Sequence, residues 1–273
     1  MSVINTNVSA LQAQNAASVN ARAMSTAMQQ LSTGSRINSA KDDAAGLAIG
    51  QTMTSQVRGL NQAVRNLNDG VNMIQTAEGA LNETSNMLQR MRELAVQSSN
   101  GTNSGTQRSY LQTEFAALAG QINKIATDTT WNGTNLLQAS ASFSFQAGMN
   151  SGQTIVVAVA SGLTASGLLV DSSSNSIGTA AAASTAINIL DLAIGTISSQ
   201  RATFGAAVNQ MTYAMDNLSN VSANTSASRS TIMDTDYATA STQLSKSQII
   251  QQAATAMLAQ ANQQPQSVLS LLK

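Results

Sequence analysis

A long stripe of apolar residues is the clearest pattern along the chain. Between positions 53 and 74 apolar side chains recur at alternating spacings of four and three residues, which is the repeat of a coiled-coil seam. After a shift beyond Glu78 the stripe continues to Ala95. It begins behind Asp42 and Asp43, which suit a helix N-terminus, and it stops at the Ser-, Asn- and Gly-rich residues 98–105. A helix of this extent would be roughly 80 Å long, which is too long for an ordinary globular core.

A shorter helix and a β-hairpin are predicted next. Ser104 and Gln107 have the spacing of a capping box and begin a helix that ends near Asp128. The residues Trp131-Asn-Gly133 indicate a turn. From Phe143 to about Val170 the pattern becomes that of a small β-hairpin region.

The second half of the chain mirrors the first. Apolar residues from 187 to 218 share a four-three register that is interrupted only by Arg201. Two long seams separated by a hairpin favour an antiparallel bundle, in which the chain runs out along one helix and returns along another. We therefore predict a mainly α fold: an elongated antiparallel helical bundle or coiled coil with a small β-hairpin region at about 139–178.

The two chain ends resemble one another. Each has apolar positions at four-three spacing, with Gln264 the one polar member: Ala17, Ala21, Met24, Met28 and Leu31 near the start, and Ile250, Ala254, Met257, Ala261, Val268 and Leu271 near the finish. Residues 1–35 contain one charged side chain, and residues 237–273 contain two. A helix that meets many copies of itself gains from this, because symmetry would stack identical charges. We expect both ends to make protein–protein contacts on several sides and to be loosely ordered in the monomer.

Composition excludes several functions. The chain has no Cys and no His, which removes thiol nucleophiles, the commonest metal ligands and every Ser-His-Asp arrangement. Its net charge is zero, so it lacks the basic character of a nucleic-acid-binding protein. Only 10% of residues are charged, against about 25% in an average chain. No apolar run approaches the ~18 residues of a membrane span. The first residues lack the basic region and the apolar core of a secretory signal peptide.

Five acidic residues could be considered as catalytic carboxylates, namely Asp42, Asp43, Glu78, Glu83 and Glu93. They lie along one predicted helix with no His, so helix capping and surface pairing are the favoured roles. We expect no enzymatic activity, no catalytic residues, no cofactor, no metal, and no nucleic-acid or membrane partner.

Specific motifs occur in order at both ends of the chain. They are Ile4-Asn-Thr-Asn-Val-Ser-Ala-Leu11, residues 30–49 (with Arg-Ile-Asn-Ser-Ala-Lys-Asp-Asp-Ala-Ala-Gly at 36–46), Asp69 to Leu81, Met87-Leu-Gln-Arg-Met-Arg-Glu-Leu-Ala95, Gln248 to Ala253 and Ser267-Val-Leu-Ser-Leu-Leu272. On these motifs the chain resembles the bacterial flagellins.

The resemblance implies a two-part subunit. Residues 1–44 and 235–273 would form an inner terminal coiled coil, and residues 45–234 an outer helical bundle with the hairpin, without large outer domains. The subunit would polymerise with itself into the extracellular flagellar filament. It would be exported unfolded through the flagellar type III system, and its other partners would be an export chaperone and the cap and hook-junction proteins.

The resemblance also assigns residues to surfaces. Polymerisation through the terminal coiled coil would involve Ile4, Val8, Leu11, Met24, Met28, Leu31, Ile250, Met257, Val268, Leu269, Leu271 and Leu272. A surface used for assembly, and recognised by Toll-like receptor five of a host, would comprise Leu88, Gln89, Arg90, Glu93, Leu94 and Glu114. Cytosolic inflammasome sensors would recognise Val268, Leu269, Leu271 and Leu272, which would also pack in the coiled coil.

Alternatives from other classes remain. The chain could be a hook–filament junction adaptor, a surface-displayed flagellin homologue that binds a polysaccharide, or a generic coiled-coil scaffold. Some flagellins carry a zinc peptidase insert, but the absence of His and the short middle region argue against that activity here.

Overall fold

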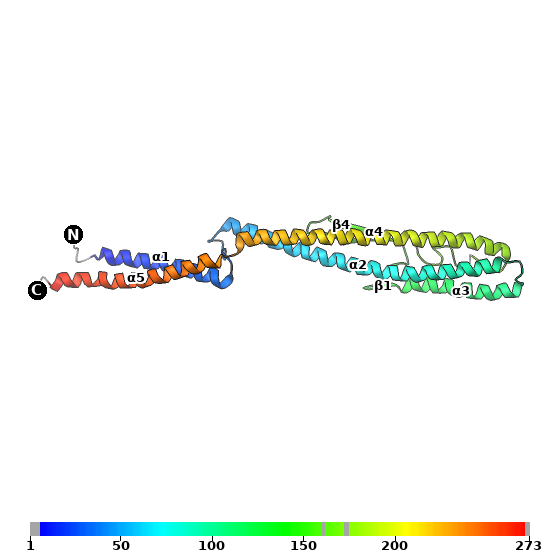
Figure 1. Cartoon of the computed structure of the whole chain (residues 1–273), viewed down its shortest axis with the longest axis horizontal. Helices are drawn as coiled ribbons and strands as arrows, with labels where there is room; N and C mark the ends of the chain where they lie inside the picture. The colour runs from blue at the N-terminus through cyan, green and yellow to red at the C-terminus, as the bar shows by residue number, and fades with distance from the viewer. Residues whose placement is uncertain (1–5, 160–161, 172–174, 271–273) are drawn as a thin grey trace. The chain divides into compact units, whose positions relative to one another are not determined.

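The computed structural model describes residues 6–159, 162–171 and 175–270, with side chains described up to Gln263. Over these residues the chain forms five helices and two short hairpins (Figure 1). The helices are α1 (Val8–Thr33), α2 (Ala44–Ser99), α3 (Gly105–Asp128), α4 (Ala180–Met233) and α5 (Tyr237–Ser270). The strands are β1 (Thr130–Trp131), β2 (Thr134–Asn135), β3 (Ala141–Gln146) and β4 (Thr154–Val159). The predicted mainly α fold with a small β region is confirmed.

The chain divides into two compact units. One comprises residues 1–57 and 223–273, and the other comprises residues 58–222. These boundaries lie within α2 and α4, whereas the boundaries predicted from the sequence coincide with the breaks between α1 and α2 and between α4 and α5. The assignment of residues 1–44 and 235–273 to an inner domain stays a prediction.

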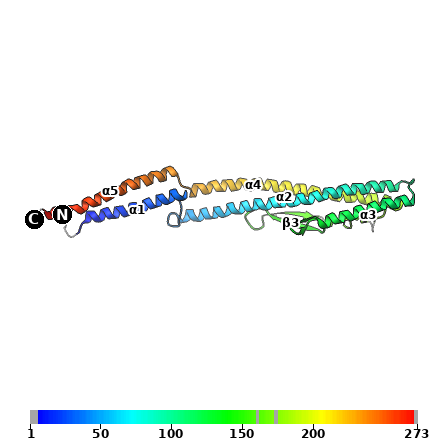
Figure 2. The same ribbon diagram turned by 90° about the horizontal axis from the view of Figure 1, so that it is seen from below.

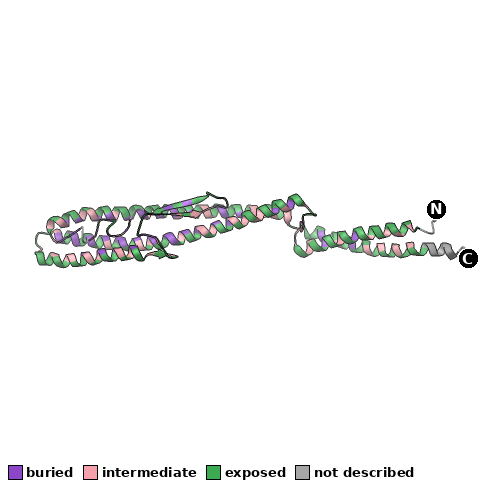
Figure 3. Cartoon of the chain, turned by 180° about the vertical axis from the view of Figure 1, so that it is seen from behind, coloured by how far each residue is buried: buried purple, intermediate pink, exposed green. Residues whose placement is uncertain are grey.

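The core of unit 58–222 is the predicted seam. Within this unit α2, α3 and α4 lie side by side (Figures 1 and 2), and their facing sides carry the buried residues (Figure 3). Large buried side chains from the three helices are Leu60, Leu67, Ile74, Leu81, Phe115, Ile122, Leu190, Ile197, Phe204 and Met211. Their burial follows directly from the four-three spacing, because that spacing keeps apolar residues on one face of a helix.

Two hairpins follow α3. The first turns at Asn132 and Gly133, whose positive φ angles of 47° and 77° suit the tight turn that the sequence predicted. In the second, β3 pairs antiparallel with β4, and alternate β4 residues Ile155, Val157 and Val159 face the core.

The predicted β region extends too far along the chain. The strands end at Val159. Residues 162–170 lie in turns and loops, in which Leu163, Ala165, Leu168 and Val170 are nonetheless buried, whereas Leu169 is exposed. The physical reason is that turn and loop hydrogen bonds, such as Val170 N to Ala165 O (2.7 Å), and side chains of α3 satisfy the backbone in this part of the chain in place of a strand partner. Asn123 Oδ1 accepts a hydrogen bond from Ala165 N (2.9 Å), and Gln112 Oε1 accepts one from Ile177 N (2.6 Å).

Helix α4 departs from one expectation. By length and composition alone it is apolar enough to cross a membrane, although no such run was expected from the sequence. Leu190, Ile197 and Phe204 on this helix are buried in the core of unit 58–222, so a core helix accounts for the same composition.

The other unit is built on α1 and α5, which pair antiparallel as predicted for the chain ends. Asn7 Nδ2 donates to Ala261 O and Asn20 Nδ2 donates to Ser247 O, both at 2.7 Å. Among the described helices this pair has the closest backbones, with many Cα atoms within 8 Å of the partner helix. Figures 1 and 2 show the two helices side by side. We call α1 and α5 together the terminal pair.

Backbone hydrogen bonds join the loops beside the terminal pair. Helix α1 ends at Gly34, whose φ of 70° is the left-handed conformation that glycine adopts readily. Arg36 N donates to Met233 O (2.7 Å) and Thr235 N donates to Gly34 O (2.9 Å). Asp43 Oδ1 accepts from Gly46 N (2.8 Å) and caps α2, as the sequence predicted.

Candidate functional site

Small and polar side chains form the interior of the terminal pair. Its buried residues are Asn20, Ala27, Ala240 and Ser247. Besides its bond to the backbone of Ser247, Asn20 Nδ2 lies 3.2 Å from Gln251 Oε1. Met24 and Leu31 on α1 and Leu244 and Leu258 on α5 are half-buried. A seam centred on alanine, serine and amide groups lets two helices approach closely, but it buries less apolar surface than a seam centred on leucines.

Large apolar side chains lie on the outside of the same pair. They are Val8, Leu11, Val19 and Met28 on α1, and Ile249, Ile250 and Met257 on α5. In Figure 3 exposed positions predominate along both helices. Exposed apolar side chains in this number favour a surface that contacts other proteins.

The predicted seam of the terminal helices is therefore wrong in detail. Met28, Ile250 and Met257 are 53%, 40% and 66% exposed, and Val8 and Leu11 are also exposed, so none of them is buried between α1 and α5. Met24 and Leu31 are half-buried. The physical reason is that the interior positions carry Asn, Ala and Ser, which a search for large apolar residues passes over.

Some predicted polymerisation residues fall beyond what can be described. Ile4, Leu271 and Leu272 lie outside the described residues. Val268 and Leu269 lie in α5, beyond the described side chains.

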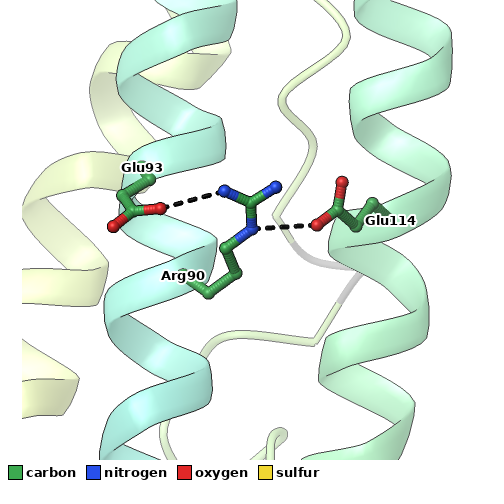
Figure 4. Close-up of polar contacts among 3 residues, drawn as sticks. All are labelled: Arg90, Glu93 and Glu114. Carbon is green, nitrogen blue, oxygen red and sulfur yellow. Dashed lines mark hydrogen bonds and ion pairs between the residues drawn. The ribbon is translucent and has the colours of Figure 1, made fainter.

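A second candidate surface lies where α2 meets α3. Arg90 on α2 donates from Nε to Glu114 Oε1 on α3 (2.9 Å) and from a terminal nitrogen to Glu93 Oε2 (3.0 Å), as Figure 4 shows. The hydrogen bond to Glu114, followed by that to Glu93, raises the pKa of Arg90 above its ordinary value. All three side chains are exposed, and so is Gln89, so we call these four residues the α2–α3 face. Exposed pairs of this kind add little stability, and this one leaves polar groups accessible to a partner.

Leu88 and Leu94 do not belong to that face. Both side chains are fully buried in the core of unit 58–222. The motif is contiguous in sequence, but a helix turns by about 100° per residue, so the stretch contributes to the core as well as to the surface. Their predicted place on an exposed surface is corrected.

Two ion pairs were not foreseen from the sequence. Arg92 Nε lies 2.6 Å from Asp191 Oδ1 on α4, and a terminal nitrogen of Arg201 lies 3.6 Å from Glu78 Oε1 on α2. The second pair accounts for the charge that interrupts the α4 seam. Both pairs join helices that are distant in sequence, so no local sequence pattern predicts them.

No metal-binding cluster is present in the part of the chain that the structure describes. There, no three His, Cys, Asp or Glu side chains gather as metal ligands would. A helical core in one unit and a terminal pair with exposed apolar side chains in the other define a class of structural protein that associates through its surfaces.

Comparison with known proteins gives the family. The chain matches the bacterial flagellin N-terminal helical region over residues 4–142 and the bacterial flagellin C-terminal helical region over residues 187–272. It is 42% identical over 272 residues to a flagellin of Halalkalibacterium halodurans, covering 99% of this chain and 100% of that protein. It is 37% identical over 371 aligned residues to flagellin B of Vibrio cholerae, covering 98% of this chain and 99% of that protein.

A solved structure agrees with these relatives. The crystal structure of Bacillus cereus flagellin matches with a TM-score of 0.50 and 32% identity, covering 56% of this chain and 88% of that chain. The chain belongs to the bacterial flagellins. It is accordingly a structural subunit that polymerises with itself into the extracellular flagellar filament and not an enzyme.

Proposed function

We propose that the terminal pair is the part of this subunit that drives polymerisation. The observation that carries the proposal is the inversion just described: the interior of the pair is small and polar, while seven large apolar side chains lie exposed outside it. Burial of such side chains against neighbouring copies contributes about 1.5–3 kcal/mol for each one fully covered. Pairing of α1 with α5 alone leaves that contribution unused.

Assembly then supplies what the free subunit lacks. In the free chain the terminal helices are loosely ordered, because their mutual contact buries little apolar surface. Neighbouring copies at the filament tip cover the exposed apolar side chains of α1 and α5, and these two helices become ordered. Contacts that are repeated head to tail without closing extend as an open helical tube.

Electron microscopy of the full chain and of a chain lacking residues 254–273 tests this proposal. Seeded full-length protein is expected to give long uniform tubes, and the truncated protein none. Circular dichroism and a cooperative unfolding transition serve as controls that unit 58–222 still folds in the truncated chain. Tubes from the truncated chain would contradict the proposal.

We further propose that the subunit is exported unfolded through the flagellar type III channel. A chain without Cys and with a single Pro avoids disulfides and slow proline isomerisation during transit. Before assembly, the exposed apolar residues of α5 would contact an export chaperone, and the assembled subunit would meet the cap and hook-junction proteins. Secretion from cells with and without a functional flagellar export gate tests the route; equal secretion from both would contradict it.

The α2–α3 face is our proposed contact for Toll-like receptor five. The exposed, hydrogen-bonded arrangement of Arg90 between Glu93 and Glu114 supports it, since these groups are accessible without unfolding. In a receptor reporter assay Arg90→Ala is expected to lower activation severalfold at an unchanged thermal midpoint. Arg92→Ala, which removes an exposed arginine paired with α4 instead, is the matched control. Equal activation by the two variants would contradict the assignment.

For cytosolic inflammasome sensors we keep the predicted contact at Val268, Leu269, Leu271 and Leu272. The support is their resemblance to the C-terminal leucines of other flagellins. Joint replacement of the four by alanine is expected to abolish sensor activation by protein delivered to the cytosol, and full activation would contradict the assignment.

A further inference from the structure

Helix α1 carries two faces that could pack on α5. The face in use contains Asn20, which is 8% exposed, and Ala27. The unused face contains Met28, which lies about 80° around the helix axis from Asn20. A modest roll of α1 would exchange them and bury the methionine in place of the amide.

The same choice exists on α5. Its face in use contains Ala240 and Ser247, both buried. The unused positions Ile250 and Met257 lie about 60° and 80° around the axis from Ser247. The faces in use also carry large half-buried side chains, Met24 and Leu31 on α1 and Leu244 and Leu258 on α5. Apolar side chains can therefore be buried in either arrangement, so hydrophobic burial alone does not choose between them.

The central rows of the seam do little to fix the rotation of α1 about its own axis. One heptad to either side of Asn20 on α1 stand Ala13 and Ala27, and one heptad to either side of Ser247 on α5 stand Ala240 and Ala254. The alanine side chains in these two rows add no knob that resists rolling. The hydrogen bonds of Gly34 and Arg36 with Thr235 and Met233 hold only the end of the pair, in loops outside both helices.

Asn20 is the residue that distinguishes the two settings. Its amide nitrogen has two acceptors, Ser247 O at 2.7 Å and Gln251 Oε1 at 3.2 Å. The second acceptor is specific to this place on α5, because the residues one heptad away from Gln251 are Leu244 and Leu258. A buried amide that loses its partners is costly, so a polar pair at a helix interface selects one arrangement among several.

We propose that the Asn20–Gln251 amide pair positions α1 on α5 so that Met28, Ile250 and Met257 stay outside, available to neighbouring copies. The pair thereby keeps these three side chains accessible for polymerisation. This inference rests on the proposed role of the terminal pair in polymerisation. Asn20 and Gln251 are positioning residues: they need not touch the neighbouring subunit.

Engineered disulfides can report the roll, because the chain has no cysteine of its own. One reporter pair is Ala27→Cys with Ala240→Cys, and the other is Met28→Cys with the same Ala240→Cys. Adjacent positions on a helix point about 100° apart, so one α1 cysteine faces residue 240 and the other does not. Cross-linking is read in the full chain, both free and assembled on filament seeds.

With Asn20 present, the 27–240 disulfide is expected to dominate. In Asn20→Leu the ratio of 27–240 to 28–240 cross-linking is expected to fall by about tenfold, which corresponds to one hydrogen bond of ordinary net strength. Without the reporter cysteines, the same variant is expected to give fewer filaments from seeds. Gln251→Leu, which leaves Asn20 its bond to Ser247 O, is expected to shift the ratio in the same direction but less.

Two controls separate positioning from a general structural effect. Asn15→Leu makes the same chemical change at an exposed position of α1 and is expected to leave the ratio unchanged. The double variant Asn20→Gln with Gln251→Asn restores an amide pair and is expected to recover the 27–240 preference and filament yield. Circular dichroism confirms that each variant is folded.

The outcomes distinguish this inference from the function beneath it. An unchanged cross-link ratio in Asn20→Leu overturns the inference, and so does an amide exchange that fails to rescue. Absence of both cross-links in the parent chain overturns the pairing on which the inference depends. Filaments from the chain lacking residues 254–273 overturn the proposed polymerisation role while leaving the roll measurement to stand on its own.

Discussion

Leu88 and Gln89 are neighbours in sequence with opposite roles in the structure. Leu88 is fully buried in the core of unit 58–222, and Gln89 is exposed. Leu88→Ala is expected to lower the free energy of unfolding by ~2–5 kcal/mol, because it leaves a cavity that the packed core fills only in part. Gln89→Ala is expected to change it by no more than about 0.5 kcal/mol. Denaturant unfolding followed by circular dichroism compares them, and equal midpoints would show that Leu88 is not a core residue.

Asp236 couples the start of α5 to pH. A hydrogen bond from Thr239 Oγ1 (2.7 Å), with further bonds from the backbone, lowers the pKa of Asp236 below its ordinary value of 3.8. A lowered carboxyl pKa means that ionised Asp236 stabilises the fold. The stabilisation is complete above pH 3.8 and is lost as pH falls through the lowered pKa.

The expected result is a loss of helical signal from α5 on acidification that is smaller in Asp236→Asn. Asparagine can still cap the helix, but it has no charge to lose. Circular dichroism from about pH 5 to about pH 2 measures it. Because Asp42, whose pKa the Ser39 hydroxyl lowers, adds a similar loss beside α2, the comparison is made between variants and not from the parent curve alone. Superimposable curves would contradict the role of Asp236.

At the scale of elements, two glycines of α2 make a matched pair. A Cβ atom at Gly70 would lie 2.9 Å from Cδ1 of Phe145 on β3, whereas a Cβ at Gly79 would meet nothing within 4 Å. Glycine inside a helix costs about 0.5–1 kcal/mol relative to alanine. Gly79→Ala is therefore expected to stabilise the unit by that amount, and Gly70→Ala to destabilise it by pushing β3 away from α2. Thermal unfolding of the two variants decides, and equal stabilisation by both would show that β3 does not lie against Gly70.

The predictable elements were those with strong local signals. The α2 seam is apparent because large apolar residues such as Leu60 and Leu67 recur without a gap. Helix starts followed from Asp43 and from the capping box of Ser104 with Gln107, in which the serine side chain and the glutamine side chain each accept a backbone hydrogen bond. Local signals of this kind act within one turn and need no knowledge of the rest of the chain.

Other features depend on partners that are distant in sequence. Residues 162–170 bury most of their apolar side chains without forming strands. Local turn hydrogen bonds and Asn123 on α3 satisfy their backbone, and Gln112 on α3 does so further along at Ile177. The contact face of α1 depends on Gln251, more than 200 residues away. Periodicity identifies a seam by its apolar residues. Asn20 and Ser247 are polar, so the sequence pattern favours the neighbouring face with Met28 instead.

For the whole molecule, charge and exposed apolar surface lead to different expectations for how salt affects polymerisation. The chain has no net charge, and the described parts of α1 and α5 carry few charged side chains, among them Arg22 and Lys246. Screening of charge by salt therefore has little to act on during polymerisation. Burial of Met28 and Met257 against neighbouring copies is an apolar effect, and sulfate strengthens such burial because it is excluded from protein surfaces.

Filament growth from seeds is accordingly expected to accelerate in ammonium sulfate and to change little in sodium chloride of equal ionic strength. Light scattering follows the rate, and Met28→Ser is expected to lower both the rate and its response to sulfate, because the replaced side chain no longer gains from leaving water. Thr26→Ser, on the same helix at an exposed polar position, is the control. A strong and equal response to the two salts would point instead to charge repulsion between subunits. Growth would then depend on the few charged side chains of the ends and not on their exposed apolar side chains.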